Sequence, residues 1–154
     1  MFTVYTLFKF VHVMAVIMWL GGLMTISLIT ARLGREQDPS AQAAMARQSA
    51  FLGQIVIGPS AGITLIAGII MVVDSGIGFD TLWIVWGLVG VVVSMGLGAT
   101  VIRKAGEQLT ELAPSAGPGD PRVIALQSRL RVTGLFNLLL LVSVVAMMVF
   151  KPTL

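Results

Sequence analysis

The chain has 154 residues, of which 56% are hydrophobic and only 11% charged, and its mean hydropathy is +0.96. This composition excludes an ordinary water-soluble domain and predicts an all-α integral membrane protein surrounded by the lipid bilayer. The net charge of +3 does not indicate a nucleic-acid-binding surface, because the Lys and Arg residues gather in the links between apolar runs.

Four apolar runs are each long enough to cross a bilayer, whose hydrocarbon core of roughly 30 Å needs about 20 helical residues. We expect a single domain covering residues 1–154, folded as a four-helix transmembrane bundle. No basic cluster precedes the first run, which is also too long for the apolar part of a secretory signal, so we expect a retained helix. The predicted spans cover about residues 4–31, 50–73, 79–102 and 132–150.

Basic residues distinguish the two sides of the membrane. The link after the first span contains Arg32, Arg35 and Arg47, whereas the link after the second contains Asp74 and Asp80 but no Lys or Arg. Basic links stay in the cytoplasm, so both termini are predicted to lie on the non-cytoplasmic side, in what we expect to be a bacterial inner membrane. The link before the fourth span is basic again, with Arg103, Lys104, Arg122, Arg129 and Arg131.

Both basic links carry the same helix-start signal. Asp38 and Asp120 are each followed by proline, the pattern of an N-cap residue with proline at the first helical position. Each signal predicts a helix that begins in the cytoplasm and runs into the membrane. Residues 105–112 are predicted to extend the third span into the cytoplasm, and a loop is predicted over residues 114–119.

Small residues recur at helical spacing in two spans. Gly90, Ser94 and Gly98 lie four residues apart in the third span, and Gly58 and Gly62 form a similar pair in the second. Helices in lipid associate through close backbone approach, so these faces are predicted to be contact surfaces. We favour packing within the bundle, while a homo-oligomer or a contact with a partner in a membrane complex uses the same motif.

His12 is the only histidine and one of few polar side chains inside the spans. It precedes Trp19 by seven residues, so both lie on one face of a helix. Neutral imidazole can ligate haem iron or another metal. Met147 and Met148 lie at a similar depth and are candidate second ligands, although methionines in such chains mostly fill packing gaps. Asn137 lies about 13 Å deeper, so we expect no direct contact with His12 unless the helices shift or tilt.

Matches to known membrane proteins are spread along nearly the whole chain. They comprise Lys9-x-x-His12, Trp19-x-x-Gly22-Leu23, Pro59, Gly62, Gly68, Trp83, Asn137 and Lys151-Pro152. This pattern resembles the bacterial four-helix membrane protoporphyrinogen oxidases. The segments FVHVMAVIMWLGGL and MMVFKP are also similar to the copper-resistance D-type membrane domain. The resemblance implies a four-helix fold, outward termini and a b-type haem on His12.

Two departures limit what the resemblance implies. The oxidases carry a lysine in their third helix where Trp86 and Gly87 stand in this chain. They also carry an acidic residue and a proline after the asparagine of helix four, where Leu138 and Leu139 follow Asn137 here. The oxidase activity is therefore not transferred to this chain, and whether the protein is an enzyme is left open.

Three functions fit the sequence. The first is a haem b protein that passes electrons within the membrane or to a quinone, with His12 as an axial ligand. The second is a structural or accessory subunit in which His12 only hydrogen-bonds a neighbouring helix. The third is copper passage through His12, Met14 and Met18. The sequence contains no cysteine, phosphate-binding loop, catalytic triad or nucleic-acid module, which disfavours hydrolase chemistry and nucleic-acid binding.

Overall fold

The computed structural model describes residues 3–33, 38–117 and 119–152. Arg35 from the first basic link, and the side chain of Arg32, lie outside the described residues. The elements are α1 (Val4–Leu33), α2 (Pro39–Leu52), the π-helical segment η1 (Gly53–Ile57), α3 (Gly58–Ser75), α4 (Leu82–Leu97), the π-helical segment η2 (Gly98–Ile102), α5 (Arg103–Ala116) and α6 (Pro121–Phe150).

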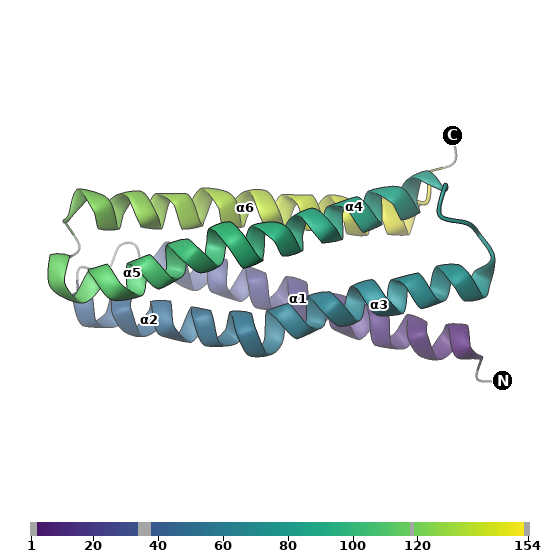
Figure 1. Ribbon diagram of the computed structural model, residues 1–154, viewed down its shortest axis with the longest axis horizontal. Helices are drawn as coiled ribbons and strands as arrows, with labels where there is room; N and C mark the ends of the chain where they lie inside the picture. The colour runs from purple at the N-terminus through teal and green to yellow at the C-terminus, as the bar shows by residue number, and fades with distance from the viewer. Residues whose placement is uncertain (1–2, 34–37, 118, 153–154) are drawn as a thin grey trace.

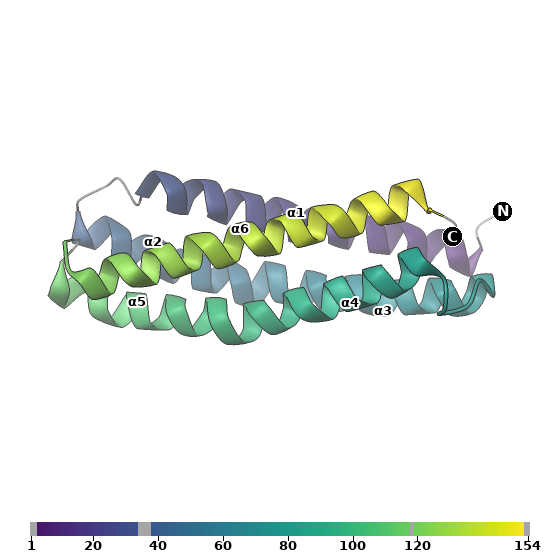
Figure 2. The same ribbon diagram turned by 90° about the horizontal axis from the view of Figure 1, so that it is seen from above.

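The described residues form four long helical rods that lie side by side (Figure 1 and Figure 2). Elements α2, η1 and α3 follow one another without a break and make one rod, and α4, η2 and α5 make another. Each rod contains a stretch that is long and apolar enough to cross a membrane. The prediction of an all-α membrane bundle is therefore confirmed. The predicted spans fall within the rods, except that residues 79–81 of the third span precede the start of α4 at Leu82.

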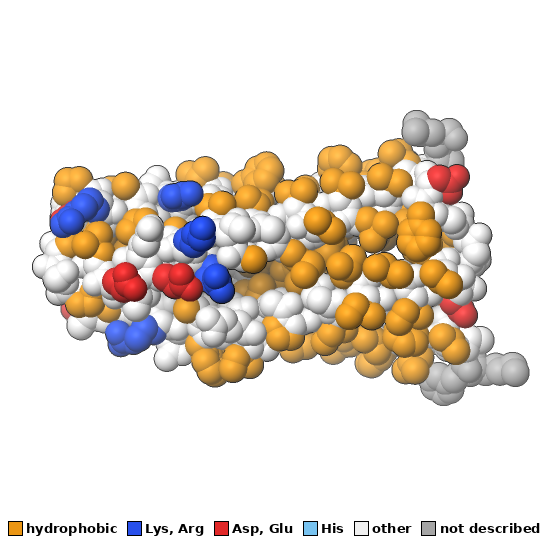
Figure 3. Space-filling view, in the orientation of Figure 1, with side chains coloured by type: hydrophobic (Ala, Val, Ile, Leu, Met, Phe, Trp, Pro, Cys, Tyr) orange, Lys and Arg blue, Asp and Glu red, His pale blue; other side chains and the backbone are white. Residues whose placement is uncertain are grey.

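The rods are longer than a membrane is thick. The second and third comprise 37 and 35 residues, or roughly 50 to 55 Å at the rise of an α-helix, against a hydrocarbon core of roughly 30 Å. The chain ends and the α3–α4 link lie at one end of the bundle (Figure 1). Lys and Arg side chains gather toward the other end, whereas the rest of the visible face has many hydrophobic side chains and no basic ones (Figure 3).

The basic end of the bundle has a small hydrophobic core of its own. Ala105, Leu109 and Ala113 are buried at helical spacing along α5, and Val123 at the start of α6 is fully buried against this cluster. The charged residues of α5 lie on the opposite, exposed face, as an amphipathic helix requires. The predicted continuation of the third span as a helix through residues 105–112 is confirmed.

One predicted boundary at this end is wrong. The helix α5 continues through Pro114 to Ala116, although a loop was expected to begin at Pro114. Proline lacks a backbone donor and normally ends a helix, but Ala113 and Ala116 pack into the cluster around Leu109. This tertiary packing holds the last turn in place, and the helix ends at Gly117, whose φ of 78° is unfavourable for other residues.

Both predicted N-caps are confirmed. The Asp38 carboxylate accepts a hydrogen bond of 2.8 Å from the backbone N–H of Ser40. Asp120 accepts a bond of the same length, 2.8 Å, from the N–H of Arg122. In each case proline occupies the first turn, where the missing donor has no helical partner to lose.

Close helix approach occurs at only some of the predicted small residues. Gly90 is buried, and a methyl of Val144 on α6 occupies the space that a Gly90 side chain would need. The methyl of Met148 fills the corresponding space at Gly87. Helices α4 and α6 thus pack against each other through glycine, which confirms the predicted contact face at Gly90.

Three other glycines of the predicted ladders do not make such contacts. A Cβ atom added to Gly62 or Gly98 would meet no atom within 4 Å, and at Gly58 it would meet only the carbonyl oxygen of Gly53 in its own rod. The prediction that these residues mark contacts within the bundle is wrong for the described residues, whereas a contact with a second copy or another partner stays a prediction. Spacing alone does not reveal which face of a helix the neighbouring rods cover.

The centre of the bundle is a cluster to which each rod contributes one buried side chain. Trp19 comes from α1, Ala61 from α3, Val91 from α4 and Leu141 from α6. Many large apolar side chains elsewhere on the rods are exposed, as expected for surfaces that face lipid rather than water. This cluster separates the end of the bundle that contains His12 from the basic end.

Candidate functional site

The sequence-predicted site begins at His12 on α1. Ala15 and Trp19 follow it on the same helical face, and both are buried, with exposed fractions of 5% and 3%. His12 itself is half-buried. The predicted shared face of His12 and Trp19 is therefore found, and this face is the one that α1 turns toward the bundle interior.

The imidazole of His12 is anchored to the neighbouring rod. Its Nδ1 lies 2.9 Å from the backbone carbonyl oxygen of Thr64 on α3. A carbonyl oxygen can only accept a hydrogen bond, so Nδ1 carries the proton and donates. In the neutral ring the lone pair then lies on Nε2, for which the described part of the chain offers no hydrogen-bond partner.

Gly68 gives the imidazole room beside α3. A Cβ atom at this position would lie 3.3 Å from Cε1 and 3.4 Å from Nδ1 of His12, closer than most real contacts of a Cβ atom. Gly68 follows Thr64 by one helical turn, so the missing side chain clears the path from the ring to the Thr64 carbonyl. Glycine at this place is therefore part of how His12 is positioned.

This geometry is one that proteins use to orient a ligating histidine. A hydrogen bond from one ring nitrogen to a backbone carbonyl fixes the tautomer and directs the other nitrogen toward a metal. The hydroxyl of Thr64 is also buried, and it has no hydrogen-bond partner among the described residues. The site thus combines an available lone pair with an unpartnered hydroxyl on adjacent rods.

The two candidate methionines lie near the end of α6. Two proximities define how α1 and α6 run past each other: Trp19 shares the central cluster with Leu141, and Ser27 approaches Gly134. Continuing this antiparallel arrangement outward brings His12 to the depth of Met148. Met147 and Met148 are both half-buried, and the methyl of Met148 is turned against Gly87 on α4.

Asn137 does not belong to this site. It is buried on α6 one turn further inward than Leu141, on the other side of the central cluster from His12. The two groups therefore lie at different depths, as expected from their positions in the sequence.

The ligands considered for copper are not brought together. Met14 and Met18 are 42% and 50% exposed and lie on the lipid-facing side of α1, whereas His12 lies on its interior side. Across the described ranges, no three His, Asp or Glu side chains gather as a metal-binding group.

The positions that depart from the oxidase pattern form contacts between α4 and α6. Trp86 donates a hydrogen bond of 3.2 Å from Nε1 to the hydroxyl of Ser143, which in turn donates to the carbonyl of Leu140. At the same end, the Lys151 ammonium lies 5.1 Å from the ring centre of Trp83, within range of a cation–π interaction. Helix packing thus occupies the place where the oxidases carry a lysine.

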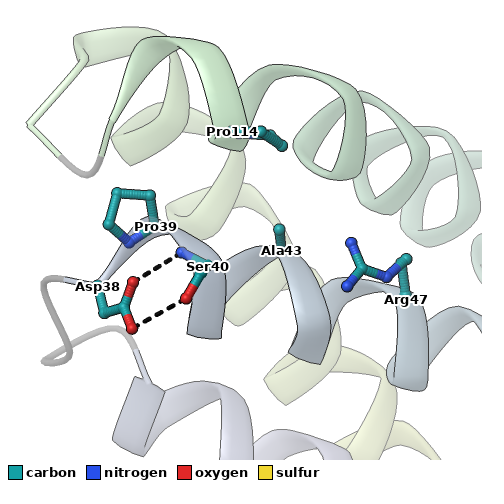
Figure 4. Close-up of a pocket in the computed structure, with 6 residues that line it drawn as sticks. All are labelled: Asp38, Pro39, Ser40, Ala43, Arg47 and Pro114. Carbon is teal, nitrogen blue, oxygen red and sulfur yellow. Dashed lines mark hydrogen bonds between the residues drawn. The ribbon is translucent and has the colours of Figure 1, made fainter.

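A pocket of about 460 Å³ lies at the basic end, between the start of α2 and Pro114 of α5 (Figure 4). The guanidinium of Arg47 extends into the space between these helices (Figure 4). The Asp38 carboxylate is held by the backbone N–H and hydroxyl of Ser40, and these bonds lower its pKa. Asp38 therefore acts as a helix cap, and its lowered pKa makes the carboxylate a weaker base than a free aspartate.

His12 could be identified from the sequence, but the group that it bonds to could not. The Thr64 carbonyl is a backbone group, and no residue type marks it in a sequence. The only signal was Gly68, which follows Thr64 by four residues and belongs to the pattern shared with the oxidases. A glycine one turn after a helix carbonyl is compatible with a side chain from a neighbouring helix reaching that carbonyl.

Comparison with known proteins places this bundle in a family. The sequence profile of a family described as "Predicted integral membrane protein (DUF2269)" matches residues 6–152, nearly the whole chain. No curated protein and no solved structure shows significant similarity to the chain. The match covers all four rods that the structure describes and agrees with their apolar character. The chain belongs to the DUF2269 family of predicted integral membrane proteins.

Proposed function

We propose that this protein binds a b-type haem in the membrane and that Nε2 of His12 is an axial ligand of the iron. The observation that carries the proposal is the hydrogen bond from Nδ1 to the Thr64 carbonyl. It fixes the neutral tautomer that ligates iron and leaves Nε2 without a partner among the described residues. Resemblance to the membrane protoporphyrinogen oxidases led to the same residue.

The surroundings of His12 fit such a role. The ring is half-buried, so a flat apolar group can reach it from the lipid side of the bundle without entering the central cluster. Thr64 holds the ring through its carbonyl, and Gly68 provides the space for that contact. Haem supplies one-electron transfer when it is bound, which suits a redox protein that exchanges electrons with a membrane partner or a quinone.

Met148 is the better of the two candidate second ligands. It lies at the depth of His12 on α6, and α1 and α6 are in contact. Its side chain now packs against Gly87, but methionine has flexible torsions that allow the sulfur to turn. Met147 is one residue earlier on the same helix and points in another direction.

Absorption spectroscopy tests the proposal. Protein purified in detergent from a haem-replete host should show a Soret band and reducible b-type bands. His12→Ala should abolish both, whereas Met14→Leu, a matched change on the lipid-facing side of α1, should leave both unchanged. A wild-type protein without haem absorbance, even after reconstitution with haemin, contradicts the proposal, and so does a His12→Ala spectrum equal to that of the wild type.

The orientation in the membrane belongs to the same proposal. We infer that the protein lies in a bacterial inner membrane with both termini on the non-cytoplasmic side, and His12 in the outer half of the bilayer. The supporting observation is that basic side chains gather at one end of the bundle, opposite the chain ends (Figures 1 and 3).

An accessory subunit is the second candidate function, and the same hydrogen bond favours it. A bond from His12 to the Thr64 carbonyl ties α1 to α3, and interhelical bonds of this kind stabilise membrane bundles without any chemistry. In that case His12→Ala lowers thermal stability, no haem is bound, and the function depends on a second copy or another membrane protein. Copurification from the native membrane then identifies the partner.

A further inference from the structure

A second polar site lies on the other side of the central cluster, away from His12. The side chains of Ser94 on α4 and Asn137 on α6 are each only 2% exposed. Ser94 Oγ and Asn137 Oδ1 are buried oxygens without a hydrogen-bond partner among the described residues. Buried polar atoms in folded proteins are nearly always paired, with protein groups or with ordered water, so these two oxygens indicate a missing partner.

The packing of α4 against α6 brings these residues to the same level. Two contacts define how the antiparallel helices run past each other: Gly87 meets Met148, and Gly90 meets Val144. Continuing this arrangement inward, Ser94 comes opposite Leu140, and Gly98 comes opposite Asn137. Ser94 and Gly98 lie one turn apart on one helical face, so the two unpartnered oxygens and Gly98 surround one place in the interface.

The glycine at this place has open space beside it. A Cβ atom on Gly98 would meet no atom within 4 Å, whereas one on Gly87 or Gly90 would clash with α6. The two helices are therefore in close contact toward the outer side, whereas the Cβ position of Gly98, at the level of Asn137, is open. The hydroxyl of Ser94 does not bond directly to Asn137, so neither residue supplies the partner that the other lacks.

The backbone changes its helical form at Gly98. The π-helical segment η2 begins at this residue. A π turn closes its hydrogen bonds over one residue more than an α turn, and the carbonyl of Gly98 accepts from the backbone N–H of Arg103. Such segments also recur at functional sites.

We propose that an ordered water molecule binds between Ser94, Gly98 and Asn137 and bridges the α4–η2 rod to α6. Water donates two hydrogen bonds, which matches the two unpartnered oxygens, and an internal water typically has two to four polar partners. No charged side chain is among the residues that form the site, which favours a neutral ligand over a cation, because an unpaired charge is costly in this environment.

Nuclear magnetic resonance can detect this water directly, because Asn137 is the only asparagine in the sequence. Protein labelled with ¹⁵N-asparagine gives a single side-chain amide signal, free of overlap. In liposomes of deuterated lipid, we expect rapid magnetisation transfer from water to this amide. Transfer no faster than to backbone amides of labelled Leu138 and Leu139 in the same helix overturns the proposal.

Matched variants connect the signal to the site. Ser94→Ala removes one partner of the water and should largely abolish the transfer to Asn137. Ser143→Ala, which removes a hydroxyl from α6 that already has partners, should leave it unchanged. Unaltered transfer in Ser94→Ala overturns the proposed bridge.

A stability measurement keeps the proposal testable if the serine variant is poorly folded. Gly96 and Gly98 both have open space at the Cβ position, but Gly96 is exposed. Alanine at position 96 should raise the melting temperature through higher helix propensity, whereas alanine at position 98 displaces the water and should lower it. An equal rise in melting temperature for both alanine variants overturns the water assignment. A wild-type melting temperature that rises with sodium concentration also overturns it, because it indicates that a cation occupies the site.

Discussion

His12 Nδ1 lies 2.9 Å from the carbonyl oxygen of Thr64, so a side chain of the first rod is bonded to the backbone of the second. Backbone carbonyls inside a helix are usually engaged within that helix, and reaching one from outside requires the absence of a side chain nearby. Gly68 meets this requirement, and the contact can therefore be tested without altering His12.

Replacing Gly68 by alanine should disturb the histidine. The added methyl lies 3.3 Å from Cε1 of His12, so the ring has to shift and its bond to the Thr64 carbonyl weakens. If His12 ligates haem, Gly68→Ala should shift the Soret maximum or lower haem occupancy. Gly62→Ala on the same rod, where no atom lies within 4 Å, is the control and should match the wild-type spectrum.

The α4–α6 interface should be sensitive to volume at Gly90. A methyl group at this position overlaps with the side chain of Val144, and overpacking of this kind costs about 1–3 kcal/mol. Gly90→Ala should therefore lower the melting temperature in detergent, although alanine has the higher helix propensity. Gly62→Ala should have no such effect, and a melting temperature of Gly90→Ala equal to the wild-type value shows that α4 and α6 are not closely packed there.

Acid should destabilise the basic end of the bundle through its two helix caps. A hydrogen bond and charge contact with the Arg122 side chain, together with backbone N–H groups, lower the pKa of Asp120 below its usual 3.8. Hydrogen bonds from Ser40 lower the pKa of Asp38 in the same way. A carboxylate with a depressed pKa in the folded state stabilises the fold above its unfolded pKa, and this contribution is lost as the pH falls through the folded pKa.

Melting temperatures measured from neutral pH down to about pH 3 check this expectation, since the unfolded carboxylates titrate near pH 3.9. Asp120→Asn keeps a side-chain oxygen as cap but does not titrate. Because it lacks the charge that faces Arg122, the variant should be less stable than the wild type at neutral pH, and it should lose less stability than the wild type in acid. An Asp120→Asn variant with the pH dependence of the wild type argues against a role of this carboxylate.

Cysteine labelling tests the orientation of the bundle, and the absence of natural cysteine makes the background clean. Ser75 and Ser115 are exposed at opposite ends of the bundle, and Ser→Cys hardly changes side-chain size. A membrane-impermeant maleimide added to intact cells should label Ser75→Cys only, and Ser115→Cys should react only after the membrane is opened. The reverse pattern places the basic end outside and contradicts the inferred topology.

Features that depend on local chemistry could be predicted from the sequence. The four spans follow from apolar length, because a backbone in hydrocarbon has to satisfy its hydrogen bonds within the helix. The caps at Asp38 and Asp120 follow from short-range hydrogen bonds to residues two positions later. The common face of His12 and Trp19 follows from helix geometry alone.

Features that depend on neighbouring helices were decided only by the tertiary structure. Spacing marked Gly90 and Gly98 alike, yet α6 contacts only the first closely. Pro114 signalled a loop, yet packing of Ala113 and Ala116 around Leu109 keeps the turn helical. His12 was visible as a polar residue in an apolar span, but its partner is a backbone carbonyl 52 residues further along the chain. Such contacts depend on how the rods are rotated and tilted against one another, and no single helix encodes that.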